Sequence, residues 1–159
     1  MIIYIYAHIY VHMCACAYTR IKESRYIVEE YLENDLNPEA GISDYKFFCF
    51  NGKPYCIAYD IDRYIGHKRN FYDLEWNNLH VSTDCETFDD SRVPRPEGLE
   101  KMLEIATVLS QDFPFVRVDL YYIKGSVYFG ELTFYPWSGY VQFVPDDFDF
   151  ELGRQFETN

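Results

Sequence analysis

The chain has 159 residues, a formal net charge of −12, and many aromatic side chains, with 16 Tyr and 13 Phe. This length allows one domain with a hydrophobic core, and the aromatic content excludes a disordered chain and favours a β-rich or α/β core. The acidic balance excludes nucleic acid and anionic membranes as partners, because phosphate backbones are bound by clustered Lys and Arg. ATP stays open as a ligand, because carboxylates bind Mg²⁺ and Mg²⁺ neutralises the triphosphate.

The first 17 residues are apolar and rich in β-branched and aromatic side chains, which predicts a strand. The segment is too short for a membrane span, and His8 and His12 interrupt it. It lacks the basic region with which a signal peptide begins. We therefore expect a cytoplasmic protein without a membrane span.

The five cysteines are odd in number and have no paired zinc-ligand spacing. Cys14 and Cys16 form C-x-C rather than C-x-x-C, and Cys49, Cys56 and Cys85 are isolated. A zinc site is disfavoured because a second half-site is missing. Free thiols in a reducing cytoplasm are expected.

A strand, a loop and a hairpin are predicted next along the chain. Ser24–Leu32 has the β-branched centre of a strand, and Glu33–Ser43 has the Asn, Asp, Pro and Gly of a loop. Asp44–Asp60 predicts a hairpin, because Asn51-Gly52 suits a type I′ turn whose two central residues need positive φ. Alternate residues of its first strand share one face: Asp44, Lys46, Phe48 and Phe50.

The segment Ile61–Val93 is polar and aromatic and predicts a long functional loop with short strands around Tyr72 and His80. It carries a basic cluster in an acidic protein, Arg63, Lys68 and Arg69. Contact with phosphate and a solvated loop are equally consistent interpretations of that cluster.

Two helices are predicted in the second half of the chain. Pro94–Phe113 begins with PRPEG, and Pro96 suits the first turn, where a missing N–H does no harm. Pro145–Phe156 predicts a short helix with acidic residues in its first turn. In the longer helix, apolar residues at spacings of mostly three and four predict a core-packing face: Leu99, Met102, Leu103, Ala106, Leu109 and Phe113.

A second hairpin is predicted between these helices, with strands Phe115–Tyr122 and Ser126–Phe134 around Lys124-Gly125. The length of its turn decides which side chains share a face. A three-residue loop, with Gly125 in the left-handed conformation, puts the carboxylates of the two strands on one face. A two-residue loop puts them on opposite faces. We expect the three-residue loop.

With that loop, Arg117 lies opposite Glu131, Asp119 lies diagonal to Glu131, and Thr133 shares their face. Two carboxylates there repel unless a cation lies between them. One solution is Mg²⁺ bound by carboxylates and nucleotide phosphates, with Arg117 stabilising the transferring phosphoryl group. The other is a cross-strand salt bridge of Arg117 with Glu131, joined by Asp119, and spacing alone favours it.

Several stretches resemble a known family. RVDLY followed by GELTFYPWSG resembles the C-terminal signature of ATP-grasp enzymes, an R-x-D strand before a strand that ends near E-x-N and a Gly turn. The chain is most similar to the TupA-like ATP-grasp family, associated with teichuronopeptide and other cell-surface polymer biosynthesis. The blocks that carry this are SDYKFFCFNGKP, NFYDLEWNNL, PEGLEKMLEIATVLSQDFPFVRVDLY and FGELTFYPWSGYVQFVPDDFDFELG.

The resemblance runs from about Tyr18 to the C-terminus, which divides the chain into an apolar segment, 1–17, and a single partial domain, 18–159. It implies an α+β fold, the C-terminal half of an ATP-grasp domain. In this fold an antiparallel sheet with β-hairpins is packed by one main helix and a short C-terminal helix. The substrate-side domain and the lysine-bearing subdomain of the family are not recognisable, so we expect the chain to be incomplete as an enzyme.

The same resemblance implies ATP and Mg²⁺ as cofactors and assigns roles on the second hairpin. Asp119 and Glu131 are implied as Mg²⁺ ligands. Thr133 stands where these enzymes often have Asn, which leaves the third ligand open, since a hydroxyl is a weaker oxygen ligand than an amide carbonyl. Arg117 is implied as the catalytic group that faces the phosphates.

Nucleotide-binding roles are implied for residues nearer the N-terminus. Ile27–Leu32 resembles the hinge strand that holds adenine. In this strand Glu29 is implied to meet the exocyclic amine of adenine. The backbone of Glu30 and of Leu32, on either side of Tyr31, is implied to meet the edge of the adenine ring. Asp44 is implied as the ribose-binding carboxylate, with Lys46 beside it on the same face.

The implied function is ATP-dependent ligation of a carboxylate to an amine through an acyl phosphate, in the biosynthesis of a cell-surface polysaccharide or polymer. The sequence identifies neither substrate. The alternative is a truncated, non-catalytic module that binds a nucleotide or a partner, as a homo-oligomer or with a chain that completes the fold. A β-rich glycan-binding domain has only the aromatic content in its favour, and fold class alone does not fix function.

Overall fold

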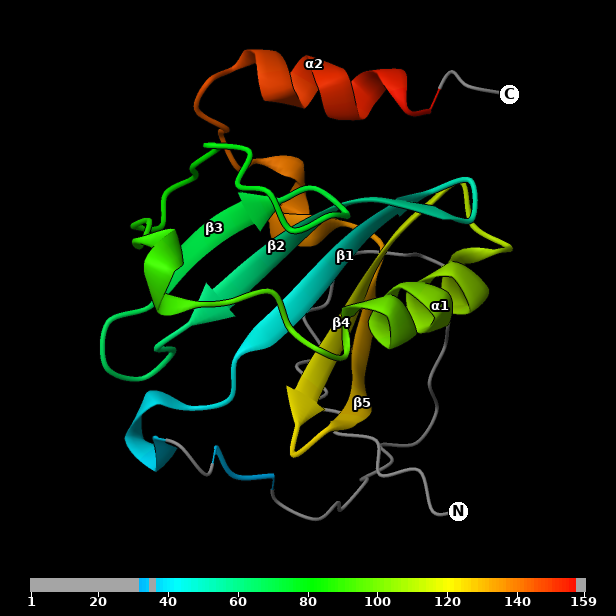
Figure 1. The fold of residues 1–159 in the computed structure, drawn as a ribbon. Coiled ribbons are helices and arrows are strands. Elements are labelled where there is room, and N and C mark those ends of the chain that lie inside the picture. The colour runs from blue at the N-terminus through cyan, green and yellow to red at the C-terminus, as the bar shows by residue number, and fades with distance from the viewer. Residues whose placement is uncertain (1–31, 35–36, 157–159) are drawn as a thin grey trace, which may run out of the picture.

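The computed structural model of the chain describes residues 32–34 and 37–156. A five-stranded antiparallel sheet forms its centre, in the order β3-β2-β1-β4-β5 (Figure 1). The strands are β1 (Asp44–Phe50), β2 (Lys53–Ile61), β3 (Lys68–Tyr72), β4 (Phe115–Ile123) and β5 (Ser126–Thr133). The helices are α1 (Leu99–Ser110) and α2 (Asp147–Arg154), with short 3₁₀ turns η1 (Pro38–Ala40), η2 (Asp90–Arg92) and η3 (Pro136–Gly139). The predicted α+β fold is confirmed.

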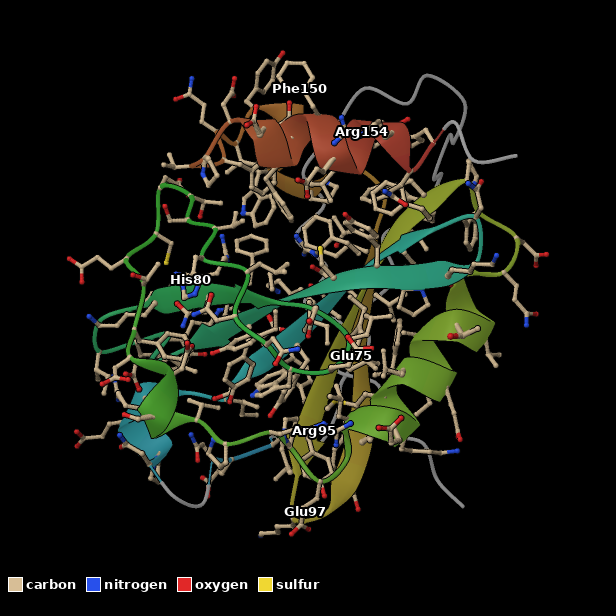
Figure 2. All side chains as sticks on the ribbon, turned by 45° about the horizontal axis from the view of Figure 1, so that its top comes forward. Glu75, His80, Arg95, Glu97, Phe150 and Arg154 are labelled. Atoms are coloured by element: carbon tan, nitrogen blue, oxygen red, sulfur yellow. The ribbon has the colours of Figure 1, made fainter. Side chains whose placement is uncertain are left out.

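The two helices cover opposite faces of the sheet (Figure 1). On α1, the predicted apolar face packs against odd-numbered β1 residues such as Phe47, with Leu99, Met102 and Ala106 fully buried. On α2, Phe148 and Leu152 join the cluster of Phe48, Phe50 and Phe71, while Phe150 points away from the sheet (Figure 2). Within the described residues no helix is both long and apolar enough to span a bilayer.

The first hairpin forms as predicted around Asn51-Gly52, whose φ angles of 49° and 76° are those of a type I′ turn. The strand near Tyr72 also forms, as β3. The predicted strand around His80 is wrong. The side chain of Asn78 accepts a hydrogen bond from the His80 N–H at 2.7 Å, and the backbone there turns into the left-handed region, with φ 54°. Only single bridges at Asn78 and Ser82 flank it.

The turn of the second hairpin differs from the prediction. Ile123 pairs with Ser126, so the loop is the two-residue Lys124-Gly125 and not three residues. A β-bulge at Gly130 restores the predicted face, because it inserts one residue into β5 between the partners of Leu120 and Asp119. Asp119 therefore lies directly opposite Glu131, not diagonal to it, and Arg117 lies opposite Thr133.

At the bulge the backbone of Gly130 lies so close to β4 that a side chain has little room. A Cβ added there would lie 3.0 Å from the carbonyl oxygen of Asp119 and 3.1 Å from the Tyr121 ring. We expect Gly130→Ala to lower the free energy of unfolding by about 1–3 kcal/mol, since overpacking strains backbone and ring. Gly153→Ala is the control: its Cβ meets nothing within 4 Å in α2, and Ala in a helix stabilises by up to about 1 kcal/mol. Urea unfolding that shows equal changes for the two variants contradicts this assignment.

Candidate functional site

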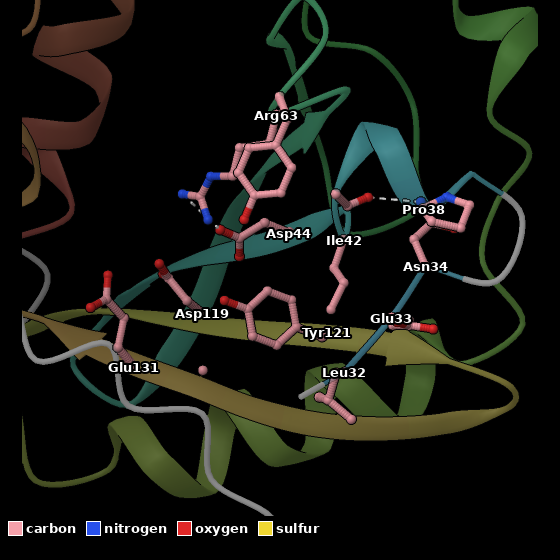
Figure 3. A pocket seen from close by; sticks show the side chains of 13 residues that line it. Leu32, Glu33, Asn34, Pro38, Ile42, Asp44, Arg63, Asp119, Tyr121 and Glu131 are labelled. Atoms are coloured by element: carbon pink, nitrogen blue, oxygen red, sulfur yellow. Dashed lines mark hydrogen bonds and ion pairs between the residues drawn. The ribbon is translucent and has the colours of Figure 1, made fainter. Parts of the chain in front are cut away.

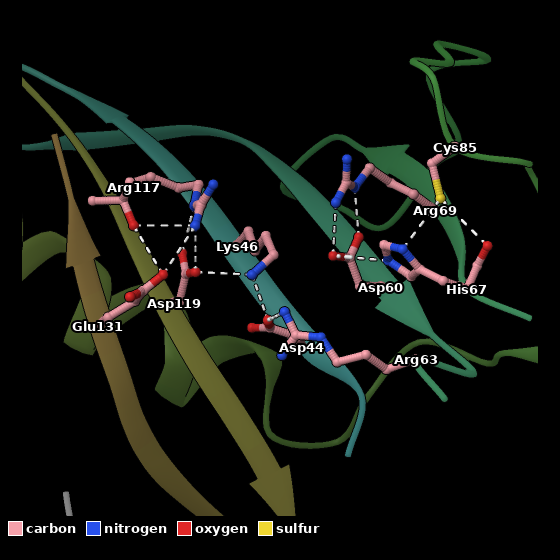
Figure 4. Close-up of polar contacts among 11 residues, drawn as sticks. Asp44, Lys46, Asp60, Arg63, His67, Arg69, Cys85, Arg117, Asp119 and Glu131 are labelled. Atoms are coloured by element: carbon pink, nitrogen blue, oxygen red, sulfur yellow. Dashed lines mark hydrogen bonds and ion pairs between the residues drawn. The ribbon is translucent and has the colours of Figure 1, made fainter. Parts of the chain in front are cut away.

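A row of charged side chains lies on the sheet face that carries α2, in the part that α2 leaves uncovered (Figures 1 and 4). We call it the charged row, and it comprises Asp44 and Lys46 of β1, Arg117 and Asp119 of β4, and Glu131 of β5. Strand pairing brings it together, since Lys46 lies opposite Asp119 and Asp119 opposite Glu131. The predicted sharing of one face by Asp44 and Lys46 is confirmed, because both contact the same network.

Asp119 is the centre of the charged row. Its Oδ1 accepts a hydrogen bond from Arg117 Nε at 2.7 Å, and its Oδ2 accepts from Arg117 Nη2 at 2.7 Å and Lys46 Nζ at 2.8 Å. The side chain is only 2% exposed. Burial by itself raises the pKa of Asp119, but Lys46 and Arg117 outweigh it and hold the pKa below its usual value. The carboxylate is therefore charged and held in one orientation.

The Arg117 guanidinium fills the gap between the three predicted metal ligands. Its Nη2 lies 2.7 Å from Asp119 Oδ2, 3.3 Å from Glu131 Oε1 and 3.1 Å from Thr133 Oγ1. Thr133 Oγ1 also donates to Glu131 Oε1 at 3.2 Å. The structure thus has the cross-strand ion pair, one of the two arrangements that the spacing allowed, with the guanidinium as the cation between the carboxylates.

Asp44 differs from Asp119 although it is equally buried. Its Oδ2 contacts Lys46 Nζ and lies 3.7 Å from Arg63 Nη2, whereas its buried Oδ1 has no hydrogen-bond partner among the described residues. Burial raises the pKa of Asp44, and the nearby Asp119 adds to this, against the opposing effect of Lys46. A buried acceptor without a donor is costly, so Asp44 Oδ1 is a place where a ligand hydroxyl or amine would be bound.

A cavity of about 540 Å³ opens beside the charged row (Figure 3). Of the predicted site residues, Leu32, Asp44, Asp119 and Glu131 line it. Lys46 and Arg117 lie behind this wall, in contact with Asp119. The predicted adenine-binding residues Glu29, Glu30 and Tyr31 lie outside the described residues.

Most of the other residues of the cavity wall were not predicted from the sequence as site residues, among them two on the loop after β2. Arg63, on the loop after β2, was left open as a phosphate contact or a solvated residue, and it lines the cavity. Tyr64 of the same loop packs on Gly41, where a Cβ would lie 2.8 Å from its ring. The basic cluster was a weak signal for Arg63, and nothing in the sequence signals Tyr64, because its position depends on contact between two loops.

The donor set fits Mg²⁺ in chemistry, although a cation already lies in place. Asp119, Glu131 and Thr133 present hard oxygen ligands to one gap, which is what Mg²⁺ prefers. In the described part of the chain, no three His, Cys, Asp or Glu side chains form a metal-binding group. Because Arg117 Nη2 lies in this gap, a metal ion could bind there only if the guanidinium left it.

Comparison with known proteins agrees with the fold and with the motifs. Residues 4–157 match the family model described as TupA-like ATPgrasp. Curated proteins and solved structures gave no match to this chain. The matched range covers nearly the whole sequence and begins upstream of Tyr18, the point from which the sequence resemblance was expected to run. The chain belongs to the TupA-like ATP-grasp family.

Proposed function

We propose that the chain binds ATP with Mg²⁺ in the cavity beside the charged row. The observation that carries the proposal is Asp44 Oδ1, a buried acceptor without a described donor, on the wall of a 540 Å³ cavity. Two buried cations, Lys46 and Arg117, lie just behind that wall. A nucleotide offers both complements, a hydroxyl donor and a polyphosphate.

The cavity wall suits the two ends of a nucleotide. Leu32, Pro38 and Ile42 form its apolar part, which fits a base, and the carboxylates and Arg63 form its polar part (Figure 3). A ribose hydroxyl that donates to Asp44 Oδ1 would satisfy this acceptor. As proposed from the sequence, Glu29, Glu30 and Tyr31 would join Leu32 at the base.

Lys46 and Arg117 are the proposed phosphate-binding groups. Both are held by Asp119 in the structure, at 2.8 Å and 2.7 Å. A phosphate attracts the Arg117 guanidinium more strongly than Asp119 does, because Asp119 already pairs with Lys46. The phosphate also carries more negative charge and offers bidentate acceptors. When Arg117 turns toward phosphate, Asp119, Glu131 and Thr133 become accessible as metal ligands. The metal, when bound, would neutralise charge on the triphosphate.

The reaction class that we propose is ligation of a carboxylate to an amine through an acyl phosphate, in cytoplasmic steps of cell-surface polymer biosynthesis. Family membership supports it, and Arg117 would stabilise charge on the transferring phosphoryl group. The alternative is a nucleotide- or partner-binding module without turnover. ADP release on addition of ATP, Mg²⁺ and candidate carboxylates favours the enzyme, and ATP binding without ADP release favours the module.

Glu131→Gln is the sharpest test of ATP binding. The Glu131 side chain is 57% exposed, so its loss leaves the fold intact, unlike that of buried Asp119. We expect Mg²⁺-dependent ATP affinity, measured by calorimetry, to fall about tenfold or more, since one of two charged metal ligands becomes neutral. The control is Glu97→Gln in the turn before α1, which is exposed (Figure 2) and does not line the cavity. Equal affinity in wild type and Glu131→Gln would sink the metal assignment.

A further inference from the structure

A second cavity, of about 510 Å³, lies near β3 and is lined in part by Trp137. His67, Arg69 and Cys85, which line it, lie apart from the charged row (Figure 4). The nucleotide proposal uses none of the residues that line it: Gly66, His67, Arg69, Asp84, Cys85, Glu86 and Trp137. Among them are a thiol and an imidazole, and a buried carboxylate that does not line the cavity, Asp60, lies behind the imidazole. This order is the one found where a base activates a nucleophile.

The three groups are in contact in the order thiol, imidazole, carboxylate, and the contact of His67 Nε2 with Asp60 is one of charge, because Nε2 has no hydrogen-bond partner among the described residues. Cys85 Sγ lies 3.6 Å from His67 Nδ1, and the thiol also donates a hydrogen bond to the His67 carbonyl oxygen, with Sγ 3.4 Å from that oxygen. His67 Nε2 lies 3.2 Å from Asp60 Oδ2. Asp60 can therefore stabilise a positive charge on the imidazole when Nδ1 accepts a proton from the thiol.

Asp60 is kept as a carboxylate by Arg69. Arg69 donates from Nε to Asp60 Oδ1 at 2.5 Å and from Nη2 to Oδ2 at 2.8 Å. Burial raises the pKa of Asp60, but these two bonds and the charge of Arg69 outweigh it and lower the pKa. The Arg69 guanidinium is itself fixed, 4.6 Å from the centre of the Trp137 ring.

Cys85 differs from the other cysteines that the structure describes. Cys49 and Cys56 are fully buried, and burial raises the pKa of Cys49 to about 12. Cys85 is partly exposed at the cavity wall. Burial raises its pKa as well, with Asp60, Asp84 and Glu86 acting in the same direction and Arg69 opposing them. The thiol is therefore protonated at neutral pH, and its reactivity depends on a base.

We propose that Cys85 is a site of covalent thiol modification, with His67 as its base, and that the cavity admits a small disulfide with which Cys85 forms a mixed disulfide. His67 Nδ1 accepts the proton of the thiol. Cys85 Sγ then attacks one sulfur of the small disulfide, the S–S bond breaks, and a new S–S bond to Cys85 forms. The departing thiolate takes the proton from His67, so Cys85 is oxidised, one half of the small disulfide is reduced, and no other reactant is needed.

The test uses the full chain and a neutral probe, 2-hydroxyethyl disulfide, at pH 7, with the modified peptides quantified by mass spectrometry. We expect Cys85 to react at least about tenfold faster than Cys49 and Cys56. We also expect Cys85 to react faster in the folded protein than in the same chain unfolded in urea, because the unfolded chain loses His67 as base. A slower reaction of Cys85 in the folded chain overturns the proposal without any variant.

A pair of histidine variants separates the base from simple exposure. His67→Asn, which keeps an acceptor but no base, should lower the rate at Cys85 about tenfold. His80→Asn, on the loop after β3, exposed and outside the second cavity, should leave the rate unchanged (Figure 2). Reaction of the buried Cys49 and Cys56 with the probe reports unfolding of a variant. If His67→Asn proves unfolded, His67→Gln takes its place. An unchanged rate in a folded His67 variant refutes the role of His67.

Discussion

Asp119→Asn is expected to lower the free energy of unfolding by about 3–5 kcal/mol, because it leaves two buried cations without their shared carboxylate. Arg117 and Lys46 are 7% and 5% exposed and make three hydrogen bonds to Asp119 between them. An amide accepts through one oxygen only and carries no charge. A chain of this size has limited stability to lose, so the variant is expected to be close to unfolding.

Asp44→Asn is the matched comparison, since Asp44 is as buried as Asp119 and contacts the same lysine. The two carboxyl groups have opposite pKa shifts, lowered for Asp119 and raised for Asp44. Ionised Asp44 is therefore less favourable in the folded chain than in the unfolded chain. We expect Asp44→Asn to cost less than about 1 kcal/mol at pH 7, or to stabilise the chain.

The pH dependence of the free energy of unfolding follows from the opposite pKa shifts of Asp119 and Asp44. The folded pKa of Asp119 lies below the unfolded value of about 3.9, so its contribution is present above that value and is lost as pH falls through the folded pKa. The folded pKa of Asp44 lies above the unfolded value, so its cost develops as pH rises from about 3.9 through the folded pKa. The deficit of Asp119→Asn relative to wild type should therefore shrink in acid.

Urea unfolding followed by circular dichroism at pH 7 and in acid measures these differences. Exposed Asp112→Asn serves as the control and should change stability by less than about 0.5 kcal/mol. Equal losses for Asp119→Asn and Asp44→Asn at pH 7 would show that burial alone, and not the cation pair, decides the effect.

Local sequence patterns were sufficient for most of the fold. The Asn51-Gly52 turn, the α1 stripe and the alternation along β1 each depend on residues close in sequence, and all three are confirmed. Local patterns were also sufficient to put Arg117 on one face with Asp119, and Glu131 on one face with Thr133, since R-x-D and G-E-x-T fix which side chains share a face within each strand. The roles of Asp44 and Lys46 came from the family resemblance.

What failed depended on contacts between distant segments. The lysine partner of Asp119 is 73 residues away, and the pairing of β1 with β4 that joins them has no signal in either strand. Gly130 carries a bulge, but glycine in a strand is also compatible with a regular ladder, so the sequence did not predict the bulge. Without it, a two-residue turn would put the carboxylates of Asp119 and Glu131 on opposite faces, which is why the three-residue turn was expected. Arg63 lies at the cavity on a loop that contacts η1, a segment distant in the sequence, through the hydrogen bond from Tyr64 N to Ala40 O at 3.3 Å.

Arg117→Gln is expected to change the affinities for metal and for nucleotide in opposite directions, if our proposal for the site holds. In the structure Arg117 Nη2 lies within 3.3 Å of an oxygen of Asp119, Glu131 and Thr133, where Mg²⁺ is proposed to bind. Removing the guanidinium removes a competing cation, so Mg²⁺ alone should bind about tenfold more tightly. ATP with Mg²⁺ should bind about tenfold or more weakly, because a phosphate-binding group is lost.

Thermal unfolding with and without Mg²⁺ reads out the first effect, and calorimetric titration with ATP reads out the second. Without metal the variant should have a lower Tm than wild type, since Asp119 and Glu131 then face each other with only Lys46 in contact with Asp119. Added Mg²⁺ should raise its Tm more than that of wild type, because a ligand stabilises the folded state in proportion to its affinity. Arg117→Lys retains a cation in the gap and should behave like wild type toward Mg²⁺. If Mg²⁺ leaves the Tm of Arg117→Gln unchanged, the guanidinium is a structural ion pair and Asp119 and Glu131 are not metal ligands.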